Sequence, residues 1–171
     1  MSVVASFEIH RITPDIVPVA PIKPLSIVFD ERISIMRGKT FPPTLVKSVP
    51  SVSWDPEYSS YYTLMMIDPD VPSRANPDYR QELHWLIVNI PAEDVAAGEV
   101  IAPYKPASPL PKTGLHRYIF LLYQQKRKLS GIRPFGYEER NSFKATKFAA
   151  EYGLGDPIAG NFYQCEYEES A

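Results

Sequence analysis

The sequence predicts a mostly β fold, a sandwich of two antiparallel sheets with one or two small peripheral helices. Three apolar runs, at 61–67, 85–90 and 118–124, carry this prediction. Each run is almost continuously apolar, as in strands that are buried on both faces. The 18 prolines are dispersed along the 171 residues. Because proline cannot donate a hydrogen bond to a central ladder, this dispersal favours many loops and edge strands.

Shorter elements are expected around these three runs. Residues 145–152 carry apolar side chains at i, i+3, i+4 and i+7, which predicts a helix with one buried face. Asn141 or Ser142 is expected to cap the start of this helix, and Gly153 to end it. Further strands are predicted at 25–29, 51–54 and 162–167.

Length and composition limit the class of protein. Residues 1–171 are expected to form one domain, since no linker, repeat or low-complexity tract divides them. The 18 Lys and Arg against 20 Asp and Glu give a net charge of −2, which predicts no nucleic-acid partner. A single cysteine, Cys165, and no signal-peptide or membrane-spanning pattern favour a cytoplasmic protein. We expect a monomer with at most peripheral membrane contact.

Polar side chains stand at the ends of the three central runs. Asp68 directly follows the first run, His84 directly precedes the second, and His116 lies two residues before the third. If the three strands are neighbours, one carboxylate and two imidazoles meet at one rim of the sheet. A nearby carboxylate favours the cationic imidazole, and such a cluster suits a phosphate or carboxylate ligand. Spacing alone also allows the alternative that each histidine is a structural residue.

Two long motifs resemble the signatures of the phosphatidylethanolamine-binding protein family. The first consists of DPDVPSR (68–74), NPDYR (76–80) and LHWLIVNIP (83–91), and the second is PKTGLHRYIFLLYQQ (111–125). The resemblance extends over nearly the whole chain. The family includes Raf kinase inhibitor proteins and a carboxypeptidase Y inhibitor. Membership implies a β-sandwich with a small anion pocket at one end, which accepts a phosphate or a phosphoethanolamine headgroup.

The resemblance also implies the residues of this pocket. His84 and His116 would supply ring N–H groups, Tyr118 its hydroxyl, and Pro72 and Pro109 rigid walls. One X-Pro bond of the first signature is expected to be cis. The implied ligand-binding set is Asp68, Val71, Pro72, Tyr79, His84, Pro109, His116 and Tyr118.

Three departures from the mammalian pattern bear on the ligand. Glu82 stands where a tryptophan commonly lines the pocket mouth, and Ser108 replaces a glycine of the rim. The further C-terminal helix of mammalian members is also expected to be absent. We therefore expect anion binding more firmly than binding of an intact lipid.

Three classes of function follow from these observations. The first is a binding module for a phosphate, a phospholipid headgroup or a phosphorylated partner, which regulates signalling without a metal or cofactor. The second is a protein–protein inhibitor of a kinase or serine protease, with Arg74, Tyr79 and the loop 104–112 facing the partner. The third is an enzyme, through a metal triad of two histidines and one aspartate or a His–Asp pair serving a nucleophile. The sequence has no G-x-S-x-G motif and no usual metal-ligand spacing, so an enzyme is not expected.

Overall fold

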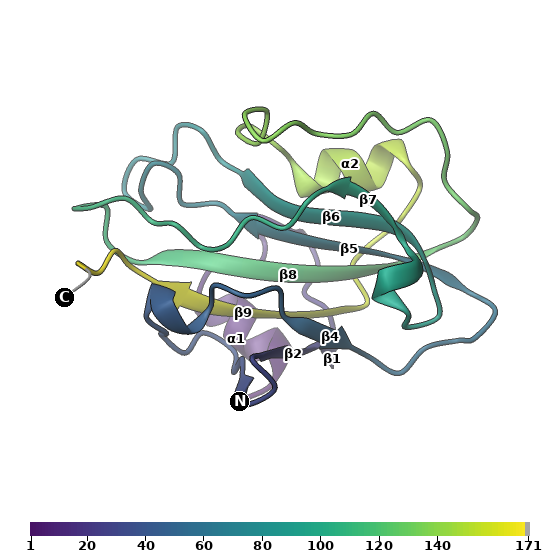
Figure 1. Cartoon of the computed structure of the whole chain (residues 1–171), viewed down its shortest axis with the longest axis horizontal. Helices are drawn as coiled ribbons and strands as arrows, with labels where there is room; N and C mark the ends of the chain where they lie inside the picture. Colours follow the sequence, from purple (N-terminus) through teal and green to yellow (C-terminus); the bar gives the residue numbers. More distant parts are fainter. Residues whose placement is uncertain (170–171) are drawn as a thin grey trace.

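A computed structural model describes residues 1–169, which form two β-sheets and a few short helices (Figure 1). All strand pairs are antiparallel except β1 with β9. The mostly β, two-sheet prediction is confirmed, with this one parallel pair as the difference. The larger sheet runs β1 (Lys23–Pro24), β9 (Ala159–Cys165), β8 (His116–Gln125), β5 (Tyr61–Asp68), β6 (Glu82–Pro91) and β7 (Glu99–Ala102). The smaller sheet runs β3 (Ile33–Ser34), β2 (Ser26–Phe29) and β4 (Ser51–Ser53).

The central strands β5, β6 and β8 are buried on both faces, as their apolar runs predict. On β5, Met65 and Ile67 belong to a core that the helices complete. Leu64 and Met66 belong to a second core that the smaller sheet completes. Because side chains alternate along a strand, one continuous apolar run supplies both cores.

Short helices lie outside the sheets. α1 (Val3–Ile9) was not anticipated, and α2 (Ala145–Glu151) is the helix that the spacing predicts. Two 3-10 turns, η1 (Pro43–Leu45) and η2 (Val95–Ala97), complete the set. Neither α-helix of the described chain has the length and apolar character needed to span a bilayer.

The predicted cap of α2 is wrong. The residue before the helix is Lys144, which makes no side-chain capping bond. The Ala145 N–H instead donates to Oε1 of Gln81, at 3.0 Å. The capping group therefore comes from a segment 64 residues earlier, which the local sequence does not reveal. The predicted end is present, since Gly153 has a φ of +65° just after the helix.

All three central strands are longer than the apolar runs that predict them. β6 begins at Glu82 and β8 at His116, so that His84 and His116 are strand residues. His116 is in register with Cys165 and Asp68 with Glu82, whereas His84 lies at a bulge between the pairs Ile67–Leu83 and Met66–Trp85. Polar side chains can occur within a paired strand, and the strand fixes their positions more firmly than a loop would.

Candidate functional site

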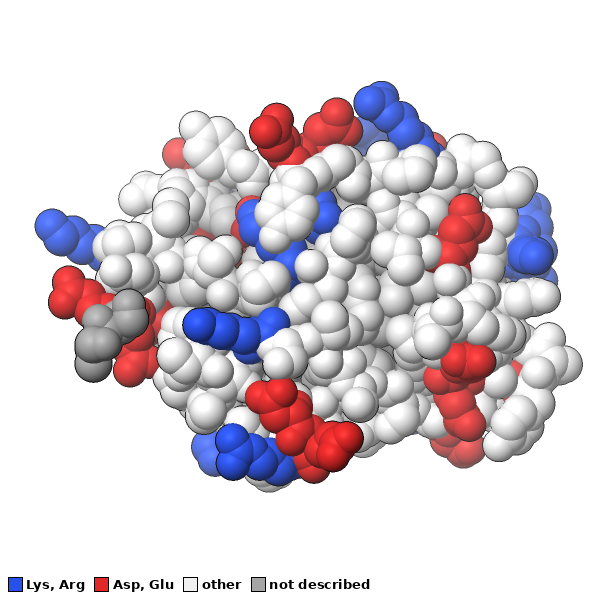
Figure 2. Space-filling view, viewed as in Figure 1, with Lys and Arg blue, Asp and Glu red and all other residues white. Residues whose placement is uncertain are grey.

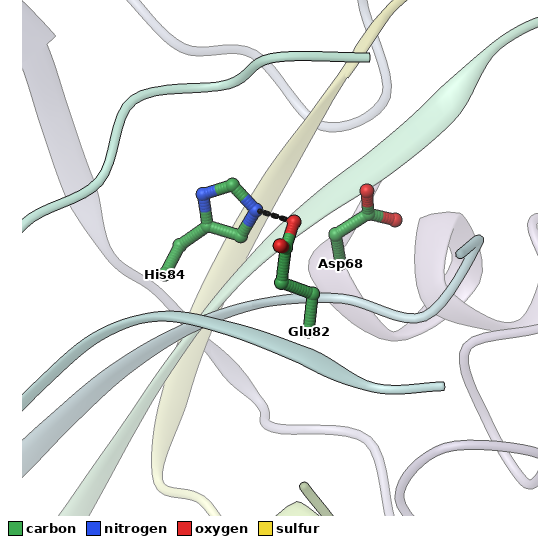
Figure 3. Close-up of side chains that lie close together, drawn as sticks. All are labelled: Asp68, Glu82 and His84. Carbon is green, nitrogen blue, oxygen red and sulfur yellow. Dashed lines mark hydrogen bonds and ion pairs between the residues drawn. The ribbon is translucent and has the colours of Figure 1, made fainter. Parts of the chain in front are cut away.

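One end of the larger sheet gathers the polar residues of the three central strands. β5 lies between β8 and β6, and Asp68 ends β5 where the other two begin. The Asp68 carboxylate reaches His116, and it also lies near Glu82 and His84 (Figure 3). These four side chains therefore share one end of the sheet.

A cavity of about 340 Å³ opens at this end. Of the eight residues that the resemblance implies, five line it: Asp68, Val71, Pro72, Tyr79 and His116. The other lining residues are Glu82, Lys105, Ser108, Leu110 and Asn141.

The three remaining residues of the implied set lie next to the cavity. Pro109 stands between two lining residues of the loop, and His84 and Tyr118 are buried behind the wall. The Tyr118 ring is stacked with the His116 ring at 6.2 Å between centroids, and it meets the His84 ring edge-on at 5.3 Å. Tyr118 thus holds both imidazole rings in place from behind.

His116 forms the first polar pair of the site. Its Nδ1 lies 2.7 Å from Oδ2 of Asp68, and its Nε2 lies 2.8 Å from the Thr113 hydroxyl. That hydroxyl donates its proton to the Leu110 carbonyl at 2.6 Å, so it accepts from His116. Burial by itself would lower the pKa of His116, but the hydrogen bond and charge of Asp68 outweigh it and raise this pKa above its usual value. The ring therefore carries its positive charge to a higher pH than a free imidazole.

Glu82 and His84 form the second polar cluster, with Lys105. The two strand residues are two positions apart and point to the same side. Glu82 Oε1 lies 2.8 Å from His84 Nε2, and its Oε2 lies 2.8 Å from Lys105 Nζ. Burial would raise the pKa of Glu82, but the hydrogen bonds and charges of His84 and Lys105 outweigh it and lower this pKa to about 2. Glu82 is therefore ionised at neutral pH.

The histidine rings differ from the expectation that both present free N–H groups to a ligand. The two ring nitrogens of His116 are hydrogen-bonded to Asp68 and Thr113. His84 directs Nδ1 at the Lys105 carbonyl, 2.7 Å away, and Nε2 at Glu82. Figure 3 shows the Glu82 carboxylate between the His84 ring and Asp68. In this arrangement the Glu82 carboxylate accepts a hydrogen bond from the His84 N–H that the resemblance assigns to a ligand.

A buried ion pair fixes the loop that follows β5. Asp70 accepts bonds from the Arg117 backbone N–H and from its guanidinium, at 2.7–2.9 Å. The Asp70 N–H in turn donates to Asp68 Oδ1 at 2.7 Å. The Val71–Pro72 bond that follows is cis, as the resemblance implies. Asp68 is therefore oriented from two sides, by His116 and by its own loop.

Three side chains of the site could approach a cation together. Asp68, Glu82 and His84 each offer one ligand atom, and these atoms lie within 4.8 Å of one another. The triad weighed from the sequence used both histidines, whereas here Glu82 takes the place of His116. The Lys105 ammonium, 2.8 Å from Glu82, already neutralises this carboxylate. A divalent cation would have to displace Lys105.

Lys105 and Asn141 are the polar lining residues that the sequence did not assign to the pocket. Lys105 lies in a proline-rich loop, and its backbone N–H donates to the His84 carbonyl at 2.8 Å. That pairing extends the edge of β6 and directs the Lys105 side chain to Glu82. Asn141 comes from the segment before α2, where the local pattern predicts a helix cap and not a residue of the cavity.

A family model described as "Phosphatidylethanolamine-binding protein" matches residues 31–164. The chain belongs to this family. A Drosophila melanogaster protein provisionally named odorant-binding protein A5 is 38% identical over 163 residues, which cover 93% of this chain and 78% of that protein. A Toxocara canis protein named 26 kDa secreted antigen is 37% identical over 159 residues, 91% of this chain. The chain spans only 61% of that antigen's length.

A solved structure shows the same fold. The crystal structure of a carboxypeptidase Y inhibitor, complexed with its cognate proteinase, matches with a TM-score of 0.81 and 23% identity. The match covers 96% of this chain and 95% of the inhibitor. The names of these similar proteins describe binding, an antigen and inhibition, not an enzymatic activity.

Proposed function

We propose that the cavity at the end of β5, β6 and β8 binds an anionic, oxygen-rich group, such as a phosphate, a phospholipid headgroup or a phosphorylated partner. One observation carries this proposal. The cationic and N–H groups around the cavity already hold carboxylate oxygens, at 2.7–2.8 Å. Donors that fit a carboxylate at these distances also fit a phosphoryl oxygen. The proposed set comprises the eight implied residues together with Lys105.

The surroundings of the cavity favour such a ligand. Val71, Pro72 and Leu110 supply apolar wall, which strengthens hydrogen bonds between charged groups. On the face drawn in Figure 2, the described Lys and Arg residues are interspersed with Asp and Glu, so they form no continuous basic area there that would itself attract anions. A volume of about 340 Å³ suits a headgroup or a phosphorylated side chain.

A titration monitored by NMR tests this proposal. Inorganic phosphate and phosphoethanolamine are added separately, so that the phosphate and the ethanolamine contributions are distinguished. We expect shifts at Lys105 and His116, and a loss of binding in Lys105→Met. Lys112→Met removes the same charge from an exposed site on the same loop, and it should bind as the wild type does. Saturating phosphate that leaves the resonances of the cavity unchanged would remove the proposal.

A second candidate function is inhibition of a protease or kinase. Tyr79 and Leu110 are 56% and 61% exposed at the mouth of the cavity, and Leu110 belongs to the loop 104–112. The similar solved structure is that of an inhibitor bound to a proteinase. Titration of the chain into a carboxypeptidase Y assay, with Tyr79→Ser as the variant, tests this function. Full protease activity at a large excess of the chain would exclude this protease as a partner.

We propose that residues 1–171 act as one monomeric domain with no catalytic role. The cytoplasmic location stays a prediction, and the relative named a secreted antigen makes it worth testing directly. Fractionation of the source cells tests the location, and light scattering of the purified chain tests the oligomeric state.

A further inference from the structure

Glu82 occupies the position that the proposed function gives to a ligand. Its two oxygens accept one bond from His84 and one from Lys105, each at 2.8 Å. The carboxylate is ionised, and it lines the cavity. It therefore satisfies the same donors that an incoming oxyanion needs.

We propose that Glu82 is an internal competitor, which sets the affinity of the cavity for oxyanions by occupying His84 and Lys105. This inference rests on the proposed function. An oxyanion has to break two hydrogen bonds between charged groups before it can form its own. The free-energy cost of displacing Glu82 makes the binding free energy of every anion that enters less favourable, and so it weakens binding.

A comparison with Asp70 distinguishes a displaceable carboxylate from a structural one. The Asp70 side chain has no exposure, and Arg117 binds both of its oxygens from within the fold. The Glu82 side chain keeps 17% exposure and borders the cavity, so it has a path to solvent. The Lys105 side chain is 20% exposed, so its ammonium can pair with Glu82 or with an incoming oxyanion. Displacement of Glu82 therefore leaves the core intact.

Isothermal titration with inorganic phosphate tests the inference, using the wild type, Glu82→Gln and Asp78→Asn. The amide of Glu82→Gln is isosteric but uncharged, so we expect it to bind phosphate about tenfold more tightly. Asp78 is exposed and adjoins Tyr79 of the cavity wall. Asp78→Asn makes the same change in net charge without freeing a donor, so its affinity should stay within about twofold of the wild type.

The side-chain carboxyl ¹³C signal of Glu82 in the wild type gives a second measurement. It should move towards its solvent-exposed value as phosphate saturates the cavity. A wild type that binds phosphate, with Glu82→Gln binding equally or more weakly, overturns the inference and leaves the proposed function standing. An unchanged Glu82 signal at saturation overturns it even if Glu82→Gln does not fold. No binding by either protein removes the proposed function itself.

Discussion

The two ends of the central strands carry buried polar side chains of opposite character. At one end Asp68, Glu82, His84 and His116 form ion pairs beside a cavity. At the other end the start of β5 and the ends of β6 and β8 carry only neutral groups, from Thr63, Asn89 and Gln125.

The buried amides of this end are fully hydrogen-bonded within the protein, and Asn89 Nδ2 also donates to the Glu99 carboxylate at 3.2 Å. Gln125 Oε1 accepts from the Thr63 hydroxyl at 2.7 Å and from the Asn89 N–H at 2.8 Å. Asn89 Oδ1 accepts from Gln125 and Leu129, and Asn89 Nδ2 donates to the Leu129 carbonyl at 2.9 Å. Reciprocal amide bonds of this kind fix the strand ends and leave no donor for a ligand.

The charged end is satisfied in a different way. Its donors are paired with carboxylates, and one of these, on Glu82, can move towards solvent. The same three strands therefore carry fully paired neutral amides at one end, and exchangeable charged groups at the end where a ligand is expected. The comparison yields predictions that separate stability from binding.

The largest effect is expected at the neutral end. Asn89→Ala removes the Oδ1 that accepts from Gln125 and from the Leu129 N–H, together with the Nδ2 that donates to the Leu129 carbonyl, and it places alanine at a φ of +56°. We expect a loss of about 3 kcal/mol in the free energy of unfolding, with phosphate affinity changed less than about twofold. Urea denaturation and calorimetry measure the two quantities. Asn76→Ala, in an exposed loop, is the control, and a large fall in affinity with unchanged stability would break the comparison.

The next effect concerns the stability that Glu82 provides at the charged end. Its pKa in the folded chain is about 2, below the usual 4.5, so its contribution is present above pH 4.5 and is lost as the pH falls towards 2. We expect wild type to exceed Glu82→Gln by about 2 kcal/mol at pH 7, with this difference shrinking below pH 4.5. Urea denaturation at a series of pH values measures it. Glu93→Gln, on an exposed turn, should show no such trend, and a difference that is constant with pH would contradict the assignment.

A smaller effect is expected from the pH dependence of anion affinity. Because the pKa of His116 is raised, the ring is still mostly charged at pH 6.5, and it loses its charge as the pH rises through the folded value. Sulfate, whose charge is constant in this range, should bind about fivefold more weakly once the ring is neutral. Calorimetry from pH 6 upwards measures the trend. His116→Gln should flatten it, and an unchanged slope in that variant would assign the titration to another group.

The smallest effect is expected from salt. Lys105 and His116 face Glu82 and Asp68, so opposite charges within the cavity largely compensate one another. Raising sodium chloride from 50 to 500 mM should weaken phosphate binding only about two- to threefold. A loss of two orders of magnitude would instead indicate a surface patch as the binding site.

The sequence was sufficient for the central strands and for part of the site. Long apolar runs predict β5, β6 and β8, and their polar neighbours identify Asp68 and the two histidines, because antiparallel strands in register bring their ends together. The two-residue strands β1 and β3 and the seven-residue helix α1 give too few residues for a periodic pattern.

The function of Glu82 depended on a contact that no local pattern contains. It pairs with Lys105, 23 residues away, because the loop that carries Lys105 adds itself to the edge of β6. A glutamate two positions from a histidine on a strand marks a potential pair. That this glutamate lies in the cavity follows only from the three-dimensional position of the loop that carries Lys105.

The cap of α2 has a consequence for how the molecule is held together around the cavity. Gln81 directly precedes β6, and while its side chain holds the first turn of the helix, its backbone exchanges two hydrogen bonds with Phe143. Asn141, on the cavity wall, belongs to this same clamped segment. One uncharged side chain next to Glu82 therefore ties the rim of the cavity to a helix on the outer surface, and the two are expected to tighten or loosen as a unit.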